Sequence, residues 1–173
     1  MSEKFKSVPI AVHYLEMHIK PYIKTTEISN ASFSKLIPPI TTKDYLHYYK
    51  TVGVLYNWND RIVMDDAQLY KIINDNKTEI FTYTVNNETV GFAEFIREDT
   101  YTEILYFGLF PDYIGKGLGK HFLKEVILEA WSNSTQWIQL NTCAFDHPNA
   151  LSVYENCGFK LIKTVVENRK IRI

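Results

Sequence analysis

The chain has 173 residues, of which 46% are hydrophobic, 23% are charged and 14% are aromatic. These proportions are close to the averages for soluble globular proteins, and they argue against a disordered chain, a coiled coil or a collagen-like repeat. The 19 basic and 20 acidic residues give a net charge of −1, so no overall positive field would attract nucleic acid or an anionic membrane.

Signals for export, membrane insertion and metal binding are weak. Residues 1–20 lack the apolar run of a signal peptide, and no segment reaches the roughly 18 apolar residues of a membrane span. Cys143 and Cys157 do not have zinc-site spacing, and a chain of this length needs no disulfide, so both are expected to be free thiols. We therefore expect one cytoplasmic domain over residues 1–173 that binds no metal, nucleic acid or membrane.

The N-terminal third contains one predicted strand and two predicted helices. Apolar and polar residues alternate in part over Pro9–Lys20, which predicts a strand at the edge of a sheet. Residues 24–40 are rich in Ser, Asn and Thr and include a Pro-Pro pair, which predicts an ordered loop. The first helix is predicted to be capped by Thr41, and the second is predicted to begin near Asp65. Between them, Leu55–Asp60 has no period and is predicted to be a loop.

The rest of the chain alternates between strand and helix patterns. Two β-rich runs, Glu79–Val85 and Thr89–Ile96, predict a hairpin, and a third strand is expected over Glu103–Phe110. Apolar residues spaced at a period near 3.6 then predict a helix from Leu118 to Trp131. The remaining predicted elements are a strand over Trp137–Cys143, a short helix over Pro148–Asn156 and a strand over Phe159–Val166. This order predicts a mixed α/β layer structure with helices packed on a central sheet.

Three glycines at alternate positions lie between a predicted strand and the strongest predicted helix. They are Gly115, Gly117 and Gly119. Without Cβ atoms the backbone can lie close to a ligand, and successive N–H groups can point at one anion. The start of a helix favours negative charge, and Lys116 and Lys120 add cationic donors. We therefore predict that this turn binds a pyrophosphate; a plain glycine turn without a ligand is the alternative.

Two familiar phosphate-binding loops do not fit this turn. A P-loop requires GxxxxGK followed by Ser or Thr, but Ile114 stands where its first glycine belongs and His121 follows Lys120. The dinucleotide fingerprint GxGxxG fails because Lys120 replaces its third glycine.

Two segments resemble the GNAT superfamily of N-acetyltransferases. Tyr113–Lys120 is similar to its acetyl-CoA signature Arg/Gln-x-x-Gly-x-Gly/Ala, with Gly117 and Gly119 at the small positions and Ile114 in place of Arg or Gln. The segment from His147 to Phe159 is similar to the family's Asn-x-x-Ala-x-x-x-Tyr-x-x-x-Gly-Phe, with His147 in place of Asn. The two motifs occur in the family's order and on the expected elements.

The resemblance covers about residues 79–166 and implies a single GNAT-like α/β domain, with a mostly antiparallel central sheet and helices on both faces. It implies direct transfer of an acetyl group from acetyl-CoA to a primary amine of a small molecule or peptide, in a ternary complex and without a metal. Relatives commonly form homodimers through a sheet edge. A weak or inactive CoA-binding or sensor module is the alternative, because Ile114 and His147 depart from the pattern; a nucleotide-phosphate binder is a third.

By this resemblance, the coenzyme would lie along the strand Glu103–Phe110. The backbone amides of Phe107, Leu109 and Phe110 are the candidate donors to its acetyl and pantetheine groups, and Gly108 is expected to permit a splay or bulge. The further candidate contacts are Ile114, Gly115, Lys116, Gly117, Leu118, Gly119, Lys120, His147 and Asn149. Capping of the short helix is an alternative role for His147.

Acetyl transfer needs a base, a group that stabilises the leaving thiolate and a pocket for the amine. Glu103 is the candidate base, because it lies as far before Ile114 as the catalytic glutamate of histone-type members; Glu94 and an ordered water are alternatives. Tyr154 is the candidate general acid, since a phenol can donate to the departing sulfur. Exposure at a strand end for Glu103 and core packing for Tyr154 are the structural alternatives.

The acceptor is predicted to contact the loop in the N-terminal third. Tyr56 and Trp58 offer an aromatic wall that could attract an ammonium, and Asp60 could pair with it. The same aromatic residues could instead cover the edge of the sheet.

Overall fold

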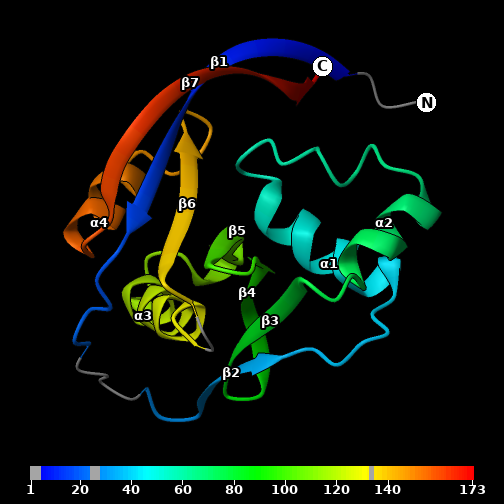
Figure 1. The fold of residues 1–173 in the computed structure, drawn as a ribbon. Helices are drawn as coiled ribbons and strands as arrows, with labels where there is room; N and C mark the ends of the chain where they lie inside the picture. The colour runs from blue at the N-terminus through cyan, green and yellow to red at the C-terminus, as the bar shows by residue number, and fades with distance from the viewer. Residues whose placement is uncertain (1–4, 24–27, 133–134) are drawn as a thin grey trace.

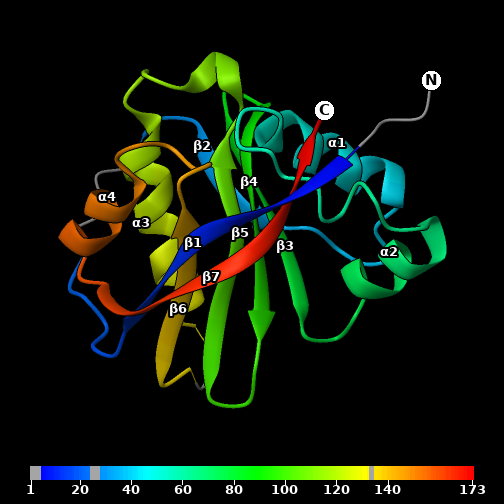
Figure 2. The same cartoon turned by 90° about the horizontal axis from the view of Figure 1, so that it is seen from above.

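A seven-stranded sheet with helices on both faces forms the frame of the protein (Figures 1 and 2). The computed structural model describes residues 5–23, 28–132 and 135–173. The strands lie in the order β2-β3-β4-β5-β6-β1-β7, and neighbours are antiparallel except for the parallel pair β5 and β6. In chain order the elements are β1 (Phe5–Met17), β2 (Ala31–Lys35), α1 (Thr42–Gly53), α2 (Asp66–Ile73), β3 (Thr78–Val85), β4 (Glu88–Arg97), β5 (Tyr101–Leu109), the 3-10 helix η1 (Pro111–Tyr113), α3 (Leu118–Ala130), β6 (Trp137–Cys143), α4 (Ala150–Asn156) and β7 (Lys160–Arg172). The expected mixed α/β sheet is confirmed.

Each face of the sheet carries its own cluster of buried side chains. On one face, α3 and α4 pack through residues such as Phe122 and Leu151. On the other, α1 and α2 pack through Tyr45 and Leu69, and Figure 2 shows the two helix pairs on opposite sides. Successive residues of a strand contribute side chains to one cluster and then to the other, because side chains alternate across a sheet. None of the helices in the described ranges is long and apolar enough to cross a bilayer.

The first two helices begin where the sequence predicts. The Thr41 hydroxyl accepts a hydrogen bond from the Asp44 amide at 3.0 Å, and the Asp65 carboxylate accepts one from the Gln68 amide at 2.8 Å. Such caps satisfy amides that a helix leaves unpaired at its start. A Cβ on Gly53, the last residue of α1, would lie 2.5 Å from the Cβ of Trp58, so glycine lets the following loop fold back closely.

Two predictions for the N-terminal segment are wrong. The first strand is not an edge strand: β1 lies between β6 and β7, and its residues Val12 and Leu15 are fully buried. The segment predicted as a loop contains β2, which pairs with β3 from Ala31↔Val85 to Lys35↔Phe81. This strand is short and polar, so pairing with β3 rather than an apolar pattern defines it. Residues 24–27 of the predicted loop lie outside the described residues.

The last strand is longer than predicted and forms an arm with β1. Beyond the residues of β1 that pair with β6, Phe5–Ala11 pair with Val166–Arg172 of β7 alone. Figure 1 shows this pair arching from the side of α4 toward the side of α1. Its end contacts the loop after α1, where the Asn59 side chain donates to the Lys170 carbonyl at 2.9 Å. The arm and this loop therefore close one side of the space above β5 and β6.

Candidate active site

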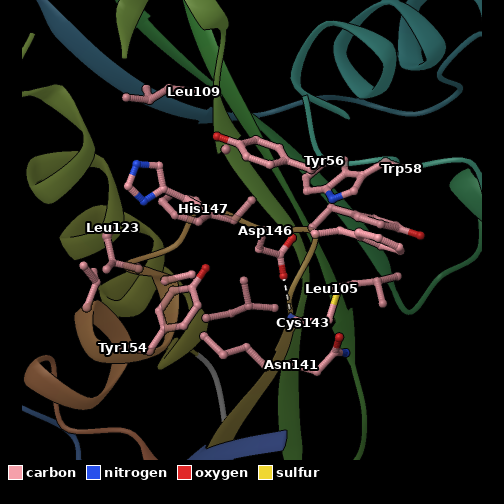
Figure 3. A pocket seen from close by; sticks show the side chains of 18 of the residues that line it. Tyr56, Trp58, Leu105, Leu109, Leu123, Asn141, Cys143, Asp146, His147 and Tyr154 are labelled. Atoms are coloured by element: carbon pink, nitrogen blue, oxygen red, sulfur yellow. Dashed lines mark hydrogen bonds between the residues drawn. The ribbon is translucent and has the colours of Figure 1, made fainter. Parts of the chain in front are cut away.

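The site lies where the two parallel strands separate. β5 and β6 pair only from Tyr101↔Trp137 to Ile104↔Leu140. Just beyond, β4 places Phe95 opposite Ile104 but Glu94 opposite Tyr106, so Leu105 is an extra residue that forms a β-bulge. A pocket of about 610 Å³ fills the gap and is walled by the two strands, α3, α4, the loop after α1 and the arm (Figure 3).

The end of β5 presents backbone groups to this pocket. The amide of Phe110, predicted as a donor to the coenzyme, instead donates to the Val90 carbonyl at 2.8 Å and is not available for that role in this structure. Because amides alternate in direction along a strand, those of Phe107 and Leu109 point toward the side of β6, beyond its last pairing with β5. Both residues line the pocket.

Gly108 lies in the part of β5 that separates from β6, but it does not form the bulge. The bulge is at Leu105, not at Gly108. A Cβ on Gly108 would lie 2.4 Å from the Cγ1 of Val52. The glycine therefore allows α1 to pack closely against β5, on the face opposite to α3.

The glycine turn has the backbone that its sequence predicts. Gly115 and Gly117 have φ angles of 81° and 79°, in the left-handed region that favours glycine, and a Cβ on either would meet no atom within 4 Å. No side chain in the described residues caps the start of α3 at Leu118, so the first amides of the helix are left for another partner. Lys116 and Lys120 beside them are exposed. This open, cationic turn fits a diphosphate.

The predicted coenzyme residues are distributed between the pocket wall and its end. Those that line the pocket are Phe107, Leu109, Ile114, Gly119, Lys120 and His147. Gly115–Leu118 connect the lining residues Ile114 and Gly119. Asn149 is exposed and does not line the pocket. His147 accepts a hydrogen bond from the Asn149 amide at 3.2 Å. Because α4 begins at Ala150 rather than Pro148, His147 fixes the turn before the helix rather than its first turn.

Tyr154 projects from α4 into the pocket (Figure 3). Its hydroxyl has no hydrogen-bond partner among the side chains of the described residues and is available to a ligand. Burial, followed by the nearby Asp146 and Tyr56, raises the pKa of this phenol above its ordinary value. Tyr154 therefore remains protonated throughout the neutral range.

The two candidate glutamates differ in their surroundings. Glu94 is fully buried and is held by the Tyr45 hydroxyl at 2.5 Å and the Arg61 guanidinium at 2.6 Å. Burial raises the pKa of Glu94 and Arg61 opposes that change, and the carboxylate lies outside the pocket wall. Glu103 is two residues before the bulge, is hydrogen-bonded to Gln139 and also lies outside the pocket wall, and burial raises its pKa. Both carboxylate oxygens of Glu94 are thus hydrogen-bonded within the core, whereas Glu103 lies next to the lining residue Ile104 but outside the pocket.

The predicted acceptor residues lie together at the other end of the pocket. Tyr56, Trp58 and Asp60 all line it. The Trp58 ring packs on Tyr106, with 4.9 Å between ring centroids, so it also covers β5. Asp60 is ion-paired with Arg169 of the arm at 3.3 Å. Its charge is therefore compensated within the chain, which local sequence could not indicate.

Comparisons with known proteins agree with this geometry. Residues 45–173 match the family model of the acetyltransferase (GNAT) domain. The chain belongs to the GNAT family. No protein with a curated description matches it.

Solved structures share the fold of this GNAT domain at low identity. A GCN5-related N-acetyltransferase from Sphaerobacter thermophilus superimposes with a TM-score of 0.66 at 13% identity, covering 96% of this chain and 53% of that one. A functionally unknown conserved protein from Staphylococcus epidermidis gives 0.61 at 17% identity, covering 98% and 64%. An aminoglycoside acetyltransferase from an uncultured soil sample, in complex with trehalose, gives 0.59 at 15% identity, covering 80% and 93%. The chain thus spans between half and two thirds of the length of the first two structures.

The lining residues of this GNAT domain that sequence reasoning missed include Asp146 and Arg169. Asp146 immediately precedes the second motif, and its Oδ2 accepts from the Cys143 amide and the Thr142 hydroxyl, both at 2.8 Å. Arg169 lies on the part of β7 beyond the predicted strand. Proximity to the motif is a signal for Asp146, whereas only the fold reveals Arg169. Cys143 also lines the pocket, and burial raises the pKa of its thiol, which disfavours a nucleophilic thiolate.

Proposed function

We propose that this GNAT domain transfers an acetyl group from acetyl-CoA to a primary amine of a small molecule or peptide. The observation that carries this proposal is the uncapped glycine turn at the start of α3, opening onto the gap where β5 and β6 separate. Acetyl-CoA supplies a thioester whose carbonyl carbon the amine can attack. One structural neighbour is an aminoglycoside acetyltransferase, in keeping with a small amine acceptor.

Backbone donors hold the coenzyme in this proposal. The amides of Gly117 and the first turn of α3 bind the diphosphate, with Lys116 and Lys120 as added cations. The amides of Phe107 and Leu109 bind the pantetheine and acetyl groups along β5. A backbone donor near the bulge stabilises the negative charge that develops on the carbonyl oxygen, because rigid amides need little reorganisation.

Tyr154 stabilises the departing sulfur. The amine nitrogen forms a bond to the carbonyl carbon as the carbon–sulfur bond breaks, and the sulfur leaves with the electron pair. Because the pKa of Tyr154 is raised above that of a simple thiol, full proton transfer to the thiolate is unfavourable. Its role is therefore to donate a hydrogen bond, and the thiol gains its proton afterwards from water.

Glu103 receives the proton of the amine through water. It lies outside the pocket wall, so direct contact with the acceptor is not part of this proposal. Burial raises its pKa toward the range in which a carboxylate is a more effective base.

Binding and turnover test the proposal separately. The melting temperature of the chain should rise with millimolar CoA or acetyl-CoA, because a ligand that binds the folded state stabilises it. Release of free thiol from acetyl-CoA should then depend on an added amine. Binding without amine-dependent release would leave the CoA-binding module, which the departures at Ile114 and His147 favour. Stabilisation by ATP in preference to CoA would instead indicate a nucleotide-phosphate binder.

A further inference from the structure

A carboxylate that the assignments above do not use lies in the middle of the pocket. Asp146 follows β6 and directs its side chain between the ring of Tyr154 on one side and those of Tyr56 and Trp58 on the other (Figure 3). Its charge acts on the hydroxyls of both Tyr56 and Tyr154, so it is close to each. Asp146 therefore lies between the coenzyme end and the acceptor end.

One oxygen of this carboxylate is fixed and the other remains for a ligand. Oδ2 accepts both hydrogen bonds that the described residues make to the side chain, from the Cys143 amide and from the buried Thr142 hydroxyl. The Asp146 amide also donates to the Cys143 carbonyl at 3.0 Å, which holds the turn. The group is thus oriented before a ligand binds, and its Oδ1 can accept a further hydrogen bond.

Two of the other carboxylates discussed above are already paired. Glu94 is bound to Arg61 in the core, and Asp60 is bound to Arg169 at 3.3 Å. Arg169 is also bound to Glu167 at 3.1 Å. Asp146 forms no ion pair with any of the described residues. Of the two carboxylates that line the pocket in the described residues, Asp60 and Asp146, it is therefore the one without an ion-pair partner.

We infer that Asp146 is the residue that binds the amine of the acceptor, with Oδ1 accepting a hydrogen bond from its nitrogen. This inference rests on the proposed acetyl transfer and names the group that captures the acceptor. An ammonium is the ligand that matches a fixed carboxylate beside aromatic rings, because ion pairing and cation–π attraction act on the same charge. Asp146, rather than Asp60, thus takes the role that the sequence predicted for an acidic partner.

The test compares D146N with the unmodified chain, using thiol release from acetyl-CoA with 1,5-diaminopentane, 1,4-diaminobutane and 2-phenylethylamine as acceptors. Asn keeps an oxygen that can accept the hydrogen bonds from Cys143 and Thr142, and it replaces the charged acceptor Oδ1 with an uncharged NH₂ group. We expect kcat/KM for the best of these amines to fall about 10- to 100-fold, as for loss of a charged hydrogen bond, mainly through the KM of the amine. The KM of acetyl-CoA should change less than about threefold.

D65N is the matched control. Asp65 also accepts a hydrogen bond from a backbone amide, at the start of α2, but it lies outside the pocket wall, so D65N should retain unmodified kinetics. D146S is a second neutral variant, should D146N fail to fold as judged by its melting temperature. Amine kinetics within threefold of the unmodified chain in a folded neutral variant would overturn the inference, as would an equal loss for acetyl-CoA and amine. If the unmodified chain releases no thiol with any of the three amines, the proposed function itself fails for this acceptor class.

Discussion

At the scale of single residues, the hydroxyl of Tyr154 is the simplest group to test. Y154F keeps the ring that packs near Phe159 and removes only the hydrogen-bond donor. We expect kcat to fall about 10- to 100-fold, the value of a hydrogen bond to a charged group, with little change in the KM of acetyl-CoA. Steady-state kinetics with a fixed amine measures both quantities. An unchanged kcat would assign Tyr154 to packing alone.

Glu103 gives a prediction that depends on pH. Burial raises its folded-state pKa above the ordinary value of about 4.3, so the folded chain binds this proton more tightly than the unfolded chain. Its contribution to stability is therefore full below about pH 4 and is lost as the pH rises through the folded-state pKa. Gln at this position cannot titrate, so E103Q should gain stability relative to the unmodified chain between those pH values. Urea unfolding of both proteins at several pH values measures the difference. Glu94 titrates in both proteins, so its contribution cancels.

Activity provides the second measurement on E103Q. If Glu103 takes the proton of the amine, kcat/KM of the unmodified chain falls toward acid pH with the pKa of this carboxyl group, and E103Q lacks that limb. Identical pH profiles for the two proteins would show that Glu103 does not accept this proton and that water accepts it unaided.

At the scale of elements, the glycine turn can be tested for anion binding without a change of shape. G117N and G117D place side chains of almost equal size at a residue with φ of 79°. Both side chains should strain the backbone there to a similar extent. The open space around the position accepts either one. The Asp charge would face the diphosphate, so we expect G117D to bind CoA at least about tenfold more weakly than G117N. Calorimetric titration with CoA measures this ratio, and equal affinities would exclude the turn as the diphosphate site.

The central position of β1 leads to a prediction about stability. Val12 is fully buried between β6 and β7, whereas Val166 on β7 is 70% exposed. Removal of the two γ-methyl groups from a buried valine loses burial energy and leaves a cavity, so V12A should lower the free energy of unfolding by about 2 kcal/mol. V166A removes the same atoms from an exposed position and should change it by less than about 0.5 kcal/mol. Chemical denaturation measures both, and equal losses would contradict an internal position for β1.

Local sequence predicts elements better than it predicts their neighbours. The caps at Thr41 and Asp65 and the glycine turn are formed by residues close together in the chain, so their patterns were sufficient. The position of β1 depends on pairing with β6, more than a hundred residues away, and partial alternation cannot tell an edge strand from an internal one. The same limit applies to the pairing of Asp60 with Arg169 and to the burial of Glu94. In each case the decisive partner is distant in sequence.

At the scale of the whole molecule, the pocket joins two ends of different charge although the net charge is −1. Lys116 and Lys120 stand at the glycine turn, where an anionic coenzyme would bind. At the other end, Arg169 is shared between Asp60 and Glu167, and next to this end Asp146 adds a carboxylate that forms no ion pair with the described residues. Lys170 borders this end, but alternation along β7 directs its side chain away from that of Arg169. The acceptor end is therefore negative and favours a cation.

This polarity predicts which of two matched amines is the better acceptor. Lysine and 1,5-diaminopentane have the same five carbons between two amines, and lysine carries one additional carboxylate. That carboxylate would meet the excess negative charge around Asp146 and Asp60, so kcat/KM should be about five- to tenfold higher for the diamine at low salt. The ratio should shrink as ionic strength rises, because salt screens partly exposed charges. Thiol release at two salt concentrations measures it, and a preference for lysine would show that the acceptor end is not negative toward its substrate.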